Sequence, residues 1–332
     1  MRRIGETELL SLAAGLPPGA RVVASGNFAA PHSVLDRLDK ACQQFVLHML
    51  NAQPGIPARD GIGYETCFVG PAMRDSAALH YVPARLSLLP ELFGSTLRPD
   101  VVVLHTSPPV DGYVSLGIEV NVLPAAVEAA RRHGGIVIAQ VNPRMPYTYG
   151  DAELPVELVD YGFEAEEGLR TVTPSLIDDP AGVIGERIGR RIGSGATLQL
   201  GIGSVPDAAL RALLADRRLK GWSEMVSDGV LGLERRGVLD VQVPITASFM
   251  FGSDELYAWA HRNPRLRMQR TETTNDPSRI AAQVEMVSIN SALQVDLFAQ
   301  VNAARRRSRI YSGFGGQTDF VVGALHSHGG QA

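Results

Sequence analysis

The chain has 332 residues, of which 45% are hydrophobic and 20% are charged, with a formal net charge of −4. This composition is typical of a globular protein long enough for two domains. The mild acidic excess argues against a nucleic-acid-binding protein, which normally carries a basic surface.

The first residues, MRRIGETELLSLAAGL, are predicted to form an amphipathic helix. Glu6 and Glu8 interrupt its apolar residues, so the segment does not fit a signal peptide. No stretch approaches the roughly 20 consecutive apolar residues that span a bilayer. The two cysteines, Cys42 and Cys67, lack metal-ligand spacing and cannot form a disulfide framework. We therefore expect a cytoplasmic protein that binds neither membranes nor a structural metal.

Short β-branched runs alternate with alanine-rich helical stretches along the chain. Among the helices, residues 123–134 place Gly134 where a C-cap is expected. Continuous apolar strands linked by helices predict an α/β fold with mainly parallel, open sheets. The predicted buried strands are RVVASG (21–26), QFVLHML (44–50), DVVVLHTS (100–107), GGIVIAQVN (134–142), TLQLGIG (197–203), VQVPITASFMFG (241–252) and SRIYSGFGG (308–316).

A strand, a glycine, a proline and a helix follow one another twice. Gly26 and Pro31 have the same offset as Gly201 and Pro206. Proline is well tolerated in the first turn of a helix, so both units have the same physical logic. The turn-forming segment TPSLIDDPAG then marks a boundary. The repetition predicts two related α/β domains, with residues 1–175 in the first and residues 176–332 in the second.

Two glycine-rich segments are candidate binding loops. GIGSVP (201–206) follows an apolar strand, so its amides could hold an anion at a helix N-terminus. It lacks the third glycine of a dinucleotide fingerprint, and a tight turn explains it equally well. SGFGGQTDF holds three glycines, Gly313, Gly315 and Gly316, directly after a predicted strand. Amides in such a loop can approach a ligand closely and stabilise an oxyanion.

Glu224 stands in the apolar run WSEMVSDGV, with no charged neighbour before Asp228. A carboxylate in such a setting can act as a base, an acid or a nucleophile. The alternative interpretation is a helix cap or a solvated side chain. Glu65, Asp111 and Glu285 are similarly isolated, so the pattern alone does not single out Glu224.

The remaining motifs are less specific. His105 lies near the end of a predicted strand, where α/β active sites gather, yet a buried core histidine is the simpler interpretation. No GxSxG or HExxH motif is present. The basic run from Arg305 to Arg309 is predicted to be a solvated turn, with an anion contact as the alternative.

Several motifs occur together in an order that resembles a known family. In the second half these are LQLGIGSVPDAAL, WSEMVSDGV, ITASFMFGSDELYAW, EMVSINSALQVDLFAQVNA and YSGFGGQTDFVVGA. The first half adds SPPVDGYVSLG and AQVNPRMPYTYGD. The set resembles the acetyl-CoA hydrolase/transferase family, in particular its 4-hydroxybutyrate and butyrate CoA-transferase branch. The likeness runs through almost the whole chain.

The resemblance implies a two-domain α/β CoA-transferase with its active site between the domains. In that family the glutamate of the SEMxSDG motif is the nucleophile, and it corresponds to Glu224. Its carboxylate attacks a short-chain acyl-CoA to give an acyl-glutamyl anhydride and CoA thiolate. The thiolate then forms a glutamyl-CoA thioester, and a second carboxylate reverses these steps. Coenzyme A is thus a substrate and a covalent intermediate, and no permanently bound cofactor or metal is expected.

The resemblance also implies roles for the binding residues. Gly313, Gly315 and Gly316 correspond to the family's oxyanion and CoA-binding loop. Gly26 and Asn27 are expected near the acyl or carboxylate site. Homo-oligomers are usual among such relatives, so a homo-oligomer is expected here as well. The CoA-contacting segment corresponds to Gly201, Ile202, Gly203, Ser204 and Val205.

Two features depart from the family pattern. Relatives usually carry a histidine at the position of Trp222, and the family normally continues with a further strand-and-helix stretch beyond residue 332. These departures leave two alternatives open. One is an acyl-CoA hydrolase, in which water intercepts the anhydride or the thioester on the same glutamate. The other is an inactive CoA-binding or scaffold protein.

Overall fold

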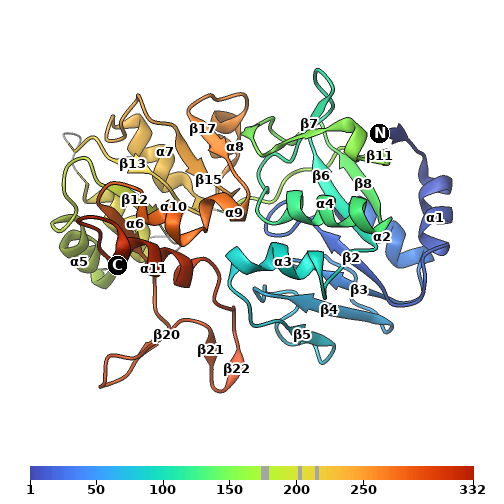
Figure 1. Ribbon diagram of the computed structural model, residues 1–332, viewed down its shortest axis with the longest axis horizontal. Coiled ribbons are helices and arrows are strands. Elements are labelled where there is room, and N and C mark those ends of the chain that lie inside the picture. The colour runs from blue at the N-terminus through green and yellow to red at the C-terminus, as the bar shows by residue number, and fades with distance from the viewer. Residues whose placement is uncertain (173–178, 201–203, 214–216) are drawn as a thin grey trace.

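The computed structural model describes residues 1–172, 179–200, 204–213 and 217–332 (Figure 1). Its first half is built around one eight-stranded sheet in which every neighbouring pair of strands is parallel. The strands lie in the order β1 (Arg2–Arg3), β11 (Tyr161–Glu164), β8 (Ile136–Val141), β6 (Val101–Thr106), β2 (Ala20–Ala24), β3 (Phe45–His48), β4 (Ile62–Thr66) and β5 (Leu79–Tyr81).

Helices cover both faces of this sheet. Successive side chains along its strands point to opposite faces and belong to two different buried apolar clusters. Val22 on β2 belongs to the cluster that contains Leu9 of α1 (Glu6–Ala14) and Leu35 of α2 (His32–Ala41). Val23, one residue on, belongs to the cluster of α3 (Leu89–Gly94) and α4 (Leu123–His133). That second cluster continues into the other half of the chain, so one core joins the two halves.

Two helix boundaries follow the sequence prediction. α2 begins at His32 with Pro31 as its N-cap residue, so the helix starts where the proline predicted it. α4 ends at Gly134, whose φ of 77° is the left-handed conformation that glycine adopts at low cost. Both predictions are confirmed.

The second half contains several smaller parallel sheets instead of one large sheet (Figure 1). β9 (Tyr149–Gly150) comes from the first half of the chain but pairs with β17 (Leu266–Met268), so strands of both halves share a sheet. The three parallel sheets are β13 (Lys220–Gly221), β12 (Thr197–Leu200) and β18 (Met286–Ile289); β15 (Ile245–Ala247), β17 (Leu266–Met268) and β9; and β14 (Met225–Val226) with β16 (Phe249–Met250).

Helices pack between and around these sheets, and three antiparallel pairs complete the fold. The helices are α5 (Asp179–Gly189), α6 (Ser204–Arg211), α7 (Asp228–Arg235), α8 (Asp254–Ala260), α9 (Thr271–Thr274), α10 (Pro277–Ala281), α11 (Gln317–His326), and the 3₁₀ turns η1 (Leu86–Leu88) and η2 (Val156–Leu158). The antiparallel pairs are β7 (Tyr113–Ser115) with β10 (Glu153–Pro155), β19 (Gln294–Val295) with β20 (Val301–Asn302), and β21 (Arg305–Arg306) with β22 (Arg309–Ile310).

The predicted α/β fold with mainly parallel sheets is confirmed, whereas the domain boundary near residue 175 stays a prediction. One strand prediction is wrong. SRIYSGFGG was expected to be a buried strand, but only Arg309–Ile310 is a strand, in an exposed hairpin. Arg309 and the neighbouring Arg305, Arg306 and Arg307 prefer water, so the hairpin stays outside the core. VQVPITASFMFG forms two short strands, β15 and β16, instead of one.

No helix in the described part of the chain has the length and apolar character needed to cross a membrane.

Candidate active site

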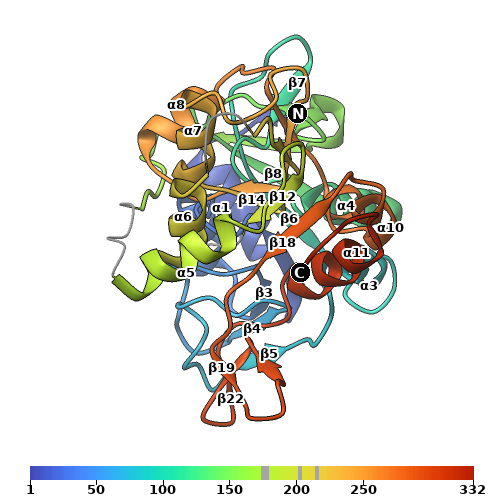
Figure 2. The ribbon, with the colours of Figure 1, turned by 90° about the vertical axis from the view of Figure 1, so that its left-hand side faces the viewer.

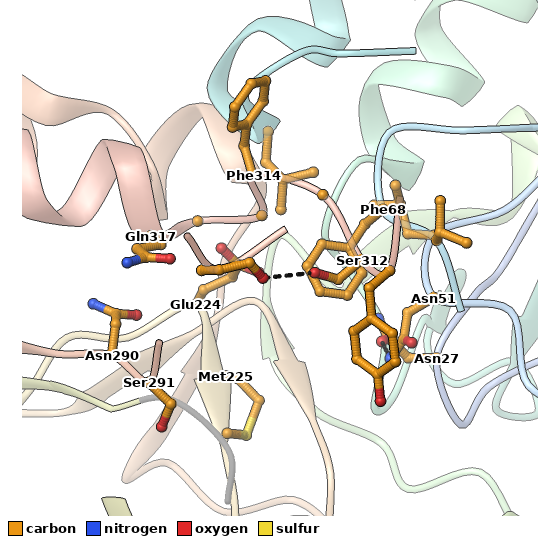
Figure 3. Close-up of a pocket in the computed structure, with 18 of the residues that line it drawn as sticks. Asn27, Asn51, Phe68, Glu224, Met225, Asn290, Ser291, Ser312, Phe314 and Gln317 are labelled. Atoms are coloured by element: carbon orange, nitrogen blue, oxygen red, sulfur yellow. Dashed lines mark hydrogen bonds between the residues drawn. The ribbon is translucent and has the colours of Figure 1, made fainter. Parts of the chain in front are cut away.

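A cavity of about 530 Å³ opens between the two halves of the chain, and Glu224 lies in its wall (Figure 3). In Figure 3, Asn27, Asn51 and Phe68 face it from the first half, while Asn290, Ser291 and Gln317 face it from the second. Most of the remaining wall is apolar, including Leu50, Val69, Leu86, Met225, Phe249, Phe251, Leu293 and Phe314. Such a cavity, apolar with a few converging polar groups, is typical of a ligand site.

Glu224 sits on a rigid backbone. It lies between β13 and β14, and its carbonyl oxygen accepts hydrogen bonds from the amides of Ser248 (2.8 Å) and Phe249 (3.0 Å). Its neighbours Ser223 and Met225 are both buried. The glutamate itself is half-buried, because its side chain faces the cavity and not bulk water.

Within the described part of the chain, the Glu224 carboxyl group forms a hydrogen bond with Asn275. The Nδ2 group of Asn275, a fully buried side chain, donates a 2.7 Å hydrogen bond to Glu224 Oε2. Burial raises the pKa of Glu224 to about 7, the Asn275 hydrogen bond opposes this shift, and the negative charge of Asp319 adds to it. A poorly hydrated carboxylate that ionises near neutral pH is suited to nucleophilic attack.

The glycine-rich loop lies directly against this carboxyl group. A side-chain Cβ on Gly316 would overlap Glu224 Oε2 and would come within 2.8 Å of Asn275 Nδ2. Gly315 has a φ of 55°, and a Cβ there would lie 2.9 Å from the Phe68 ring. Gly313 has a φ of 155° and touches the Cys67 carbonyl group. All three positions therefore require glycine, for close approach or for a positive φ.

Contacts with the first half hold this loop in place. The amide of Val69 donates a 2.6 Å hydrogen bond to the carbonyl oxygen of Ser312. The carboxylate of Asp319, in the first turn of α11, accepts from the Ser87 hydroxyl (2.8 Å) and the Ser87 amide (3.2 Å). Gly316 and Gln317, at the N-terminus of α11, line the cavity.

A second buried carboxyl group, Glu119, lies behind the cavity wall. Asn51 donates to Asn27 Oδ1 (2.9 Å), and Asn27 Nδ2 donates to Glu119 Oε2 (2.8 Å). Glu119 is bridged to Phe249, which pairs with Met225. Phe249, Met225 and Asn27 line the cavity, so Glu119 lies directly behind its wall. Burial raises the pKa of Glu119 to about 8, and the charge of Glu224 raises it further.

This pair of carboxyl groups predicts a narrow pH optimum. Activity should rise as Glu224 ionises through about 7 and fall as Glu119 ionises above about 8, because a second negative charge opposes the entry of an anionic substrate. Glu119→Gln keeps the neutral form and should remove the alkaline decline. At pH 9 the variant's kcat/KM for a carboxylate should exceed the wild-type value by up to about tenfold. An unchanged alkaline limb in the pH profile would contradict this assignment.

The other isolated carboxylates have different positions. Glu65 forms ion pairs with Arg21 and His48, whose hydrogen bonds outweigh the effect of burial and lower its pKa to about 2. Asp111 is exposed and Glu285 is half-buried, and neither lines the cavity. His105 is a satisfied core histidine: its ring nitrogens contact Ala29 O and Asn142 Nδ2.

The remaining predicted site residues are only partly placed. Gly201, Ile202 and Gly203 lie outside the described residues, while Ser204 and Val205 begin α6. Gln199 on β12, just ahead of this segment, lines the cavity. Asn27 lines it as well, with Gly26 beside it packed against the Leu50 backbone.

Trp222 does not line the cavity. Its ring packs against a small cluster that contains Ile280 and Phe320, and its Nε1 group donates to the carbonyl oxygen of Thr274 (3.1 Å). Thr274 precedes Asn275, so Trp222 helps to fix the turn that carries the partner of Glu224.

Sequence reasoning missed Asn275 and Glu119. Asn275 belongs to the turn-forming run TNDP, which carries no chemical signature. Glu119 is an isolated glutamate in the apolar run SLGIEV, the same signal that pointed to Glu224. Across the ranges that the structure describes, no three His, Cys, Asp or Glu side chains gather as a metal site.

Comparison with known proteins shows which family the chain resembles. The acetyl-CoA hydrolase/transferase N-terminal domain model matches residues 60–174, and the corresponding C-terminal domain model matches residues 252–332. The 4-hydroxybutyrate coenzyme A transferase of Clostridium kluyveri is 35% identical over 332 residues, which cover 94% of this chain and 76% of that protein.

Solved structures are similar over nearly the whole chain. The 4-hydroxybutyrate CoA-transferase of Porphyromonas gingivalis superposes with a TM-score of 0.81 at 30% identity, covering 99% of this chain and 79% of that chain. RipA of Yersinia pestis has a TM-score of 0.90 at 24% identity, covering 99% and 80%, and supports the fold alone. The fold and site thus define an enzyme of the CoA-transferase class. The chain belongs to the acetyl-CoA hydrolase/transferase family.

Proposed function

We propose that the protein is an acyl-CoA:carboxylate CoA-transferase that acts on short-chain acyl-CoA by a ping-pong mechanism through Glu224. The observation that supports this most directly is the position of the Glu224 carboxyl group. It faces the cavity, accepts a hydrogen bond from Asn275 and lies against Gly316. The names of the relatives, which are CoA-transferases, support the general reaction.

The first half-reaction transfers CoA to the enzyme. Glu224 attacks the thioester carbonyl carbon, the C–S bond breaks, and CoA thiolate leaves an acyl-glutamyl anhydride. The thiolate then attacks the glutamyl carbonyl carbon, and the acyl group departs as a carboxylate. A second carboxylate enters and reverses the two steps, which yields a new acyl-CoA and restores Glu224. The new acyl-CoA retains the thioester bond energy of the first, so no ATP is consumed.

Asn275 acts on the Glu224 side of these steps. Its amide group lies 2.7 Å from Oε2, the oxygen that gains negative charge when thiolate attacks the glutamyl carbonyl carbon. A donor already in place at that oxygen stabilises the tetrahedral intermediate without reorganisation. The amides of Gly313, Gly315 and Gly316, in the loop whose Gly316 lies against the same carboxyl group, serve the oxyanion that forms on the acyl carbonyl group.

The acyl group or free carboxylate occupies the apolar part of the cavity beside Gly26 and Asn27. Phe249, Met225 and Leu50 exclude water from that region. Exclusion of water favours transfer over hydrolysis, because the anhydride and thioester on Glu224 react with any water that reaches them.

Removing the Asn275 side chain, the hydrogen-bond partner of Glu224, should lower the rate of CoA transfer while the rest of the cavity wall stays in place. Asn275→Ala is expected to reduce kcat by about 100-fold, because one donor to the oxyanion is lost. The pKa of Glu224 should rise further, so the acid limb of the pH–rate profile moves to higher pH. Asn290→Ala is the control, because it removes an amide from the cavity wall that bonds Gln199 and Ser288 instead of Glu224. Equal losses in both variants would contradict the role of Asn275.

Initial-rate kinetics and product analysis test the proposed reaction. The purified protein is mixed with butyryl-CoA in the presence or absence of acetate. A transferase should give acetyl-CoA and butyrate, with parallel double-reciprocal plots and little free CoA. Steady accumulation of free CoA that is independent of acetate would identify a hydrolase. Absence of any turnover in a folded protein would favour a binding protein.

A further inference from the structure

Four exposed arginines gather on one hairpin that the proposed reaction does not use. β21 and β22 are joined by a two-residue turn at Arg307 and Ser308, which have the positive φ values (48° and 65°) of such a hairpin. Arg305, Arg306, Arg307 and Arg309 are all exposed. None of the four forms an ion pair with a carboxylate in the described part of the chain.

The hairpin register places like charges side by side. Arg306 lies directly opposite Arg309 in the antiparallel pair, so both side chains emerge on the same face. Opposed like charges are unfavourable in a two-stranded sheet, and this pair has no carboxylate to compensate. An anion bound between the two guanidinium groups would remove that repulsion.

The hairpin, residues 305–310, rises from the rim of the active-site cavity. Ala303 and Tyr311, on either side of its base, both line the cavity. The Tyr311 amide closes the base by donating a 2.7 Å hydrogen bond to the carbonyl oxygen of Ala304. In both ribbon views β22 projects away from the body of the protein (Figures 1 and 2). The arginines therefore stand outside the cavity, beside its opening.

A fifth arginine reinforces this positive rim. Arg74 lines the cavity, donates a 2.9 Å hydrogen bond to the Tyr311 carbonyl oxygen and stacks over the Tyr311 ring at 3.9 Å. It too lacks a carboxylate partner within the described ranges. The chain as a whole has a net charge of −4, so this rim is a local region of opposite sign. Such a region attracts anionic substrates toward the cavity.

We propose that the arginine hairpin binds the phosphate groups of the acyl-CoA substrate while the thioester reaches Glu224 inside the cavity. The inference rests on the proposed function. A CoA thioester has its reactive carbonyl group at one end and its diphosphate and 3′-phosphate groups at the other. Arginine guanidinium groups bind phosphate oxygens through paired N–H donors, and a cluster at the rim provides them where the polar end of the substrate emerges.

The test compares two thioesters that differ only in their phosphate-bearing end. Wild type and the double variant Arg306→Gln/Arg309→Gln are assayed with butyryl-CoA and with butyryl-pantetheine, which has no phosphate. The matched control is Arg2→Gln/Arg3→Gln, which removes two exposed charges from β1. We expect the hairpin variant to raise KM for butyryl-CoA about tenfold with kcat unchanged, and to weaken its dependence on salt. Activity with butyryl-pantetheine should not change.

Calorimetric titration with adenosine 3′,5′-bisphosphate keeps the inference separate from the proposed function. If the protein binds this probe and the hairpin variant binds it at least about tenfold more weakly, the phosphate site stands even when no turnover is found. Equal affinity in the hairpin variant and the control overturns the inference. An equal rise in KM for both thioesters also overturns it, because the hairpin would then act on the cavity and not on the phosphates.

Discussion

Glu224→Gln is expected to lower kcat for CoA transfer by at least about a thousandfold, because the amide cannot form the anhydride on which both half-reactions depend. The side chain keeps its size, so Asn275 and Gly316 should retain their positions. The measurement is the steady-state rate with butyryl-CoA and acetate. A variant that retains more than about one-tenth of the wild-type rate would place the nucleophile elsewhere.

Thermal unfolding of the same variant shows whether the fold survives. The pKa of Glu224 is raised to about 7, so the folded state holds its proton more tightly than the unfolded chain does. Ionisation therefore costs stability, progressively as pH rises from about 4.5 through 7. Glu224→Gln removes that cost, and we expect it to be more stable than wild type at pH 8 by on the order of 1–3 kcal/mol. The difference in stability between the variant and wild type should disappear near pH 4.5. A Glu224→Gln variant that is less stable than wild type at pH 8 would contradict the buried surroundings of the Glu224 carboxylate.

Gly316→Ala is expected to have the second largest effect. The added methyl group would overlap Glu224 Oε2, so the carboxyl group must move away from Asn275. A displacement of this size in a reacting group costs about 100-fold or more in kcat. Crowding of a close-packed region should also lower the free energy of unfolding by about 1–3 kcal/mol. Both quantities are measured on the purified variant.

Gly232→Ala provides the matched control. Gly232 lies within α7, and an added Cβ would have no heavy atom within 4 Å. Alanine is the better helix former, so stability should rise by up to about 1 kcal/mol while kcat stays unchanged. If Gly316→Ala behaves like this control, the glycine-rich loop does not confine the nucleophile.

The parts of the fold that could be predicted are those that local pattern determines. Buried parallel strands such as Val101–Thr106 are rich in β-branched residues. Gly134 ends α4 because a glycine adopts the left-handed backbone conformation of a C-cap at low cost. The solvated turn predicted for the basic run from Arg305 to Arg309 is confirmed as an exposed hairpin. The burial expected for residues 308–316 is wrong, because whether a short apolar run is buried depends on neighbours far away in the sequence. The described second half also breaks into small sheets whose pairing no local pattern encodes.

The site residues also fall into those that a local sequence pattern predicts and those that it does not. Glu224 and the glycines of its loop have sequence signals, since an isolated carboxylate and a cluster of glycines both need special surroundings. Asn275 contacts Glu224 from a position 51 residues further along the chain. Glu119 is held behind the cavity wall by its hydrogen bond with Asn27 and by the pairing of its segment with Phe249. An asparagine or glutamate acquires such a role from tertiary contacts. Only the folded structure brings these side chains together.

In the proposed mechanism, CoA is carried covalently on Glu224. Wild-type protein that turns over butyryl-CoA is incubated with this substrate, without a carboxylate acceptor, and examined by intact-mass spectrometry and peptide mapping. The proposed mechanism predicts an adduct of CoA mass on the peptide that contains Glu224, and no adduct in Glu224→Gln. An active protein without such an adduct, or with the adduct on another residue, would contradict it.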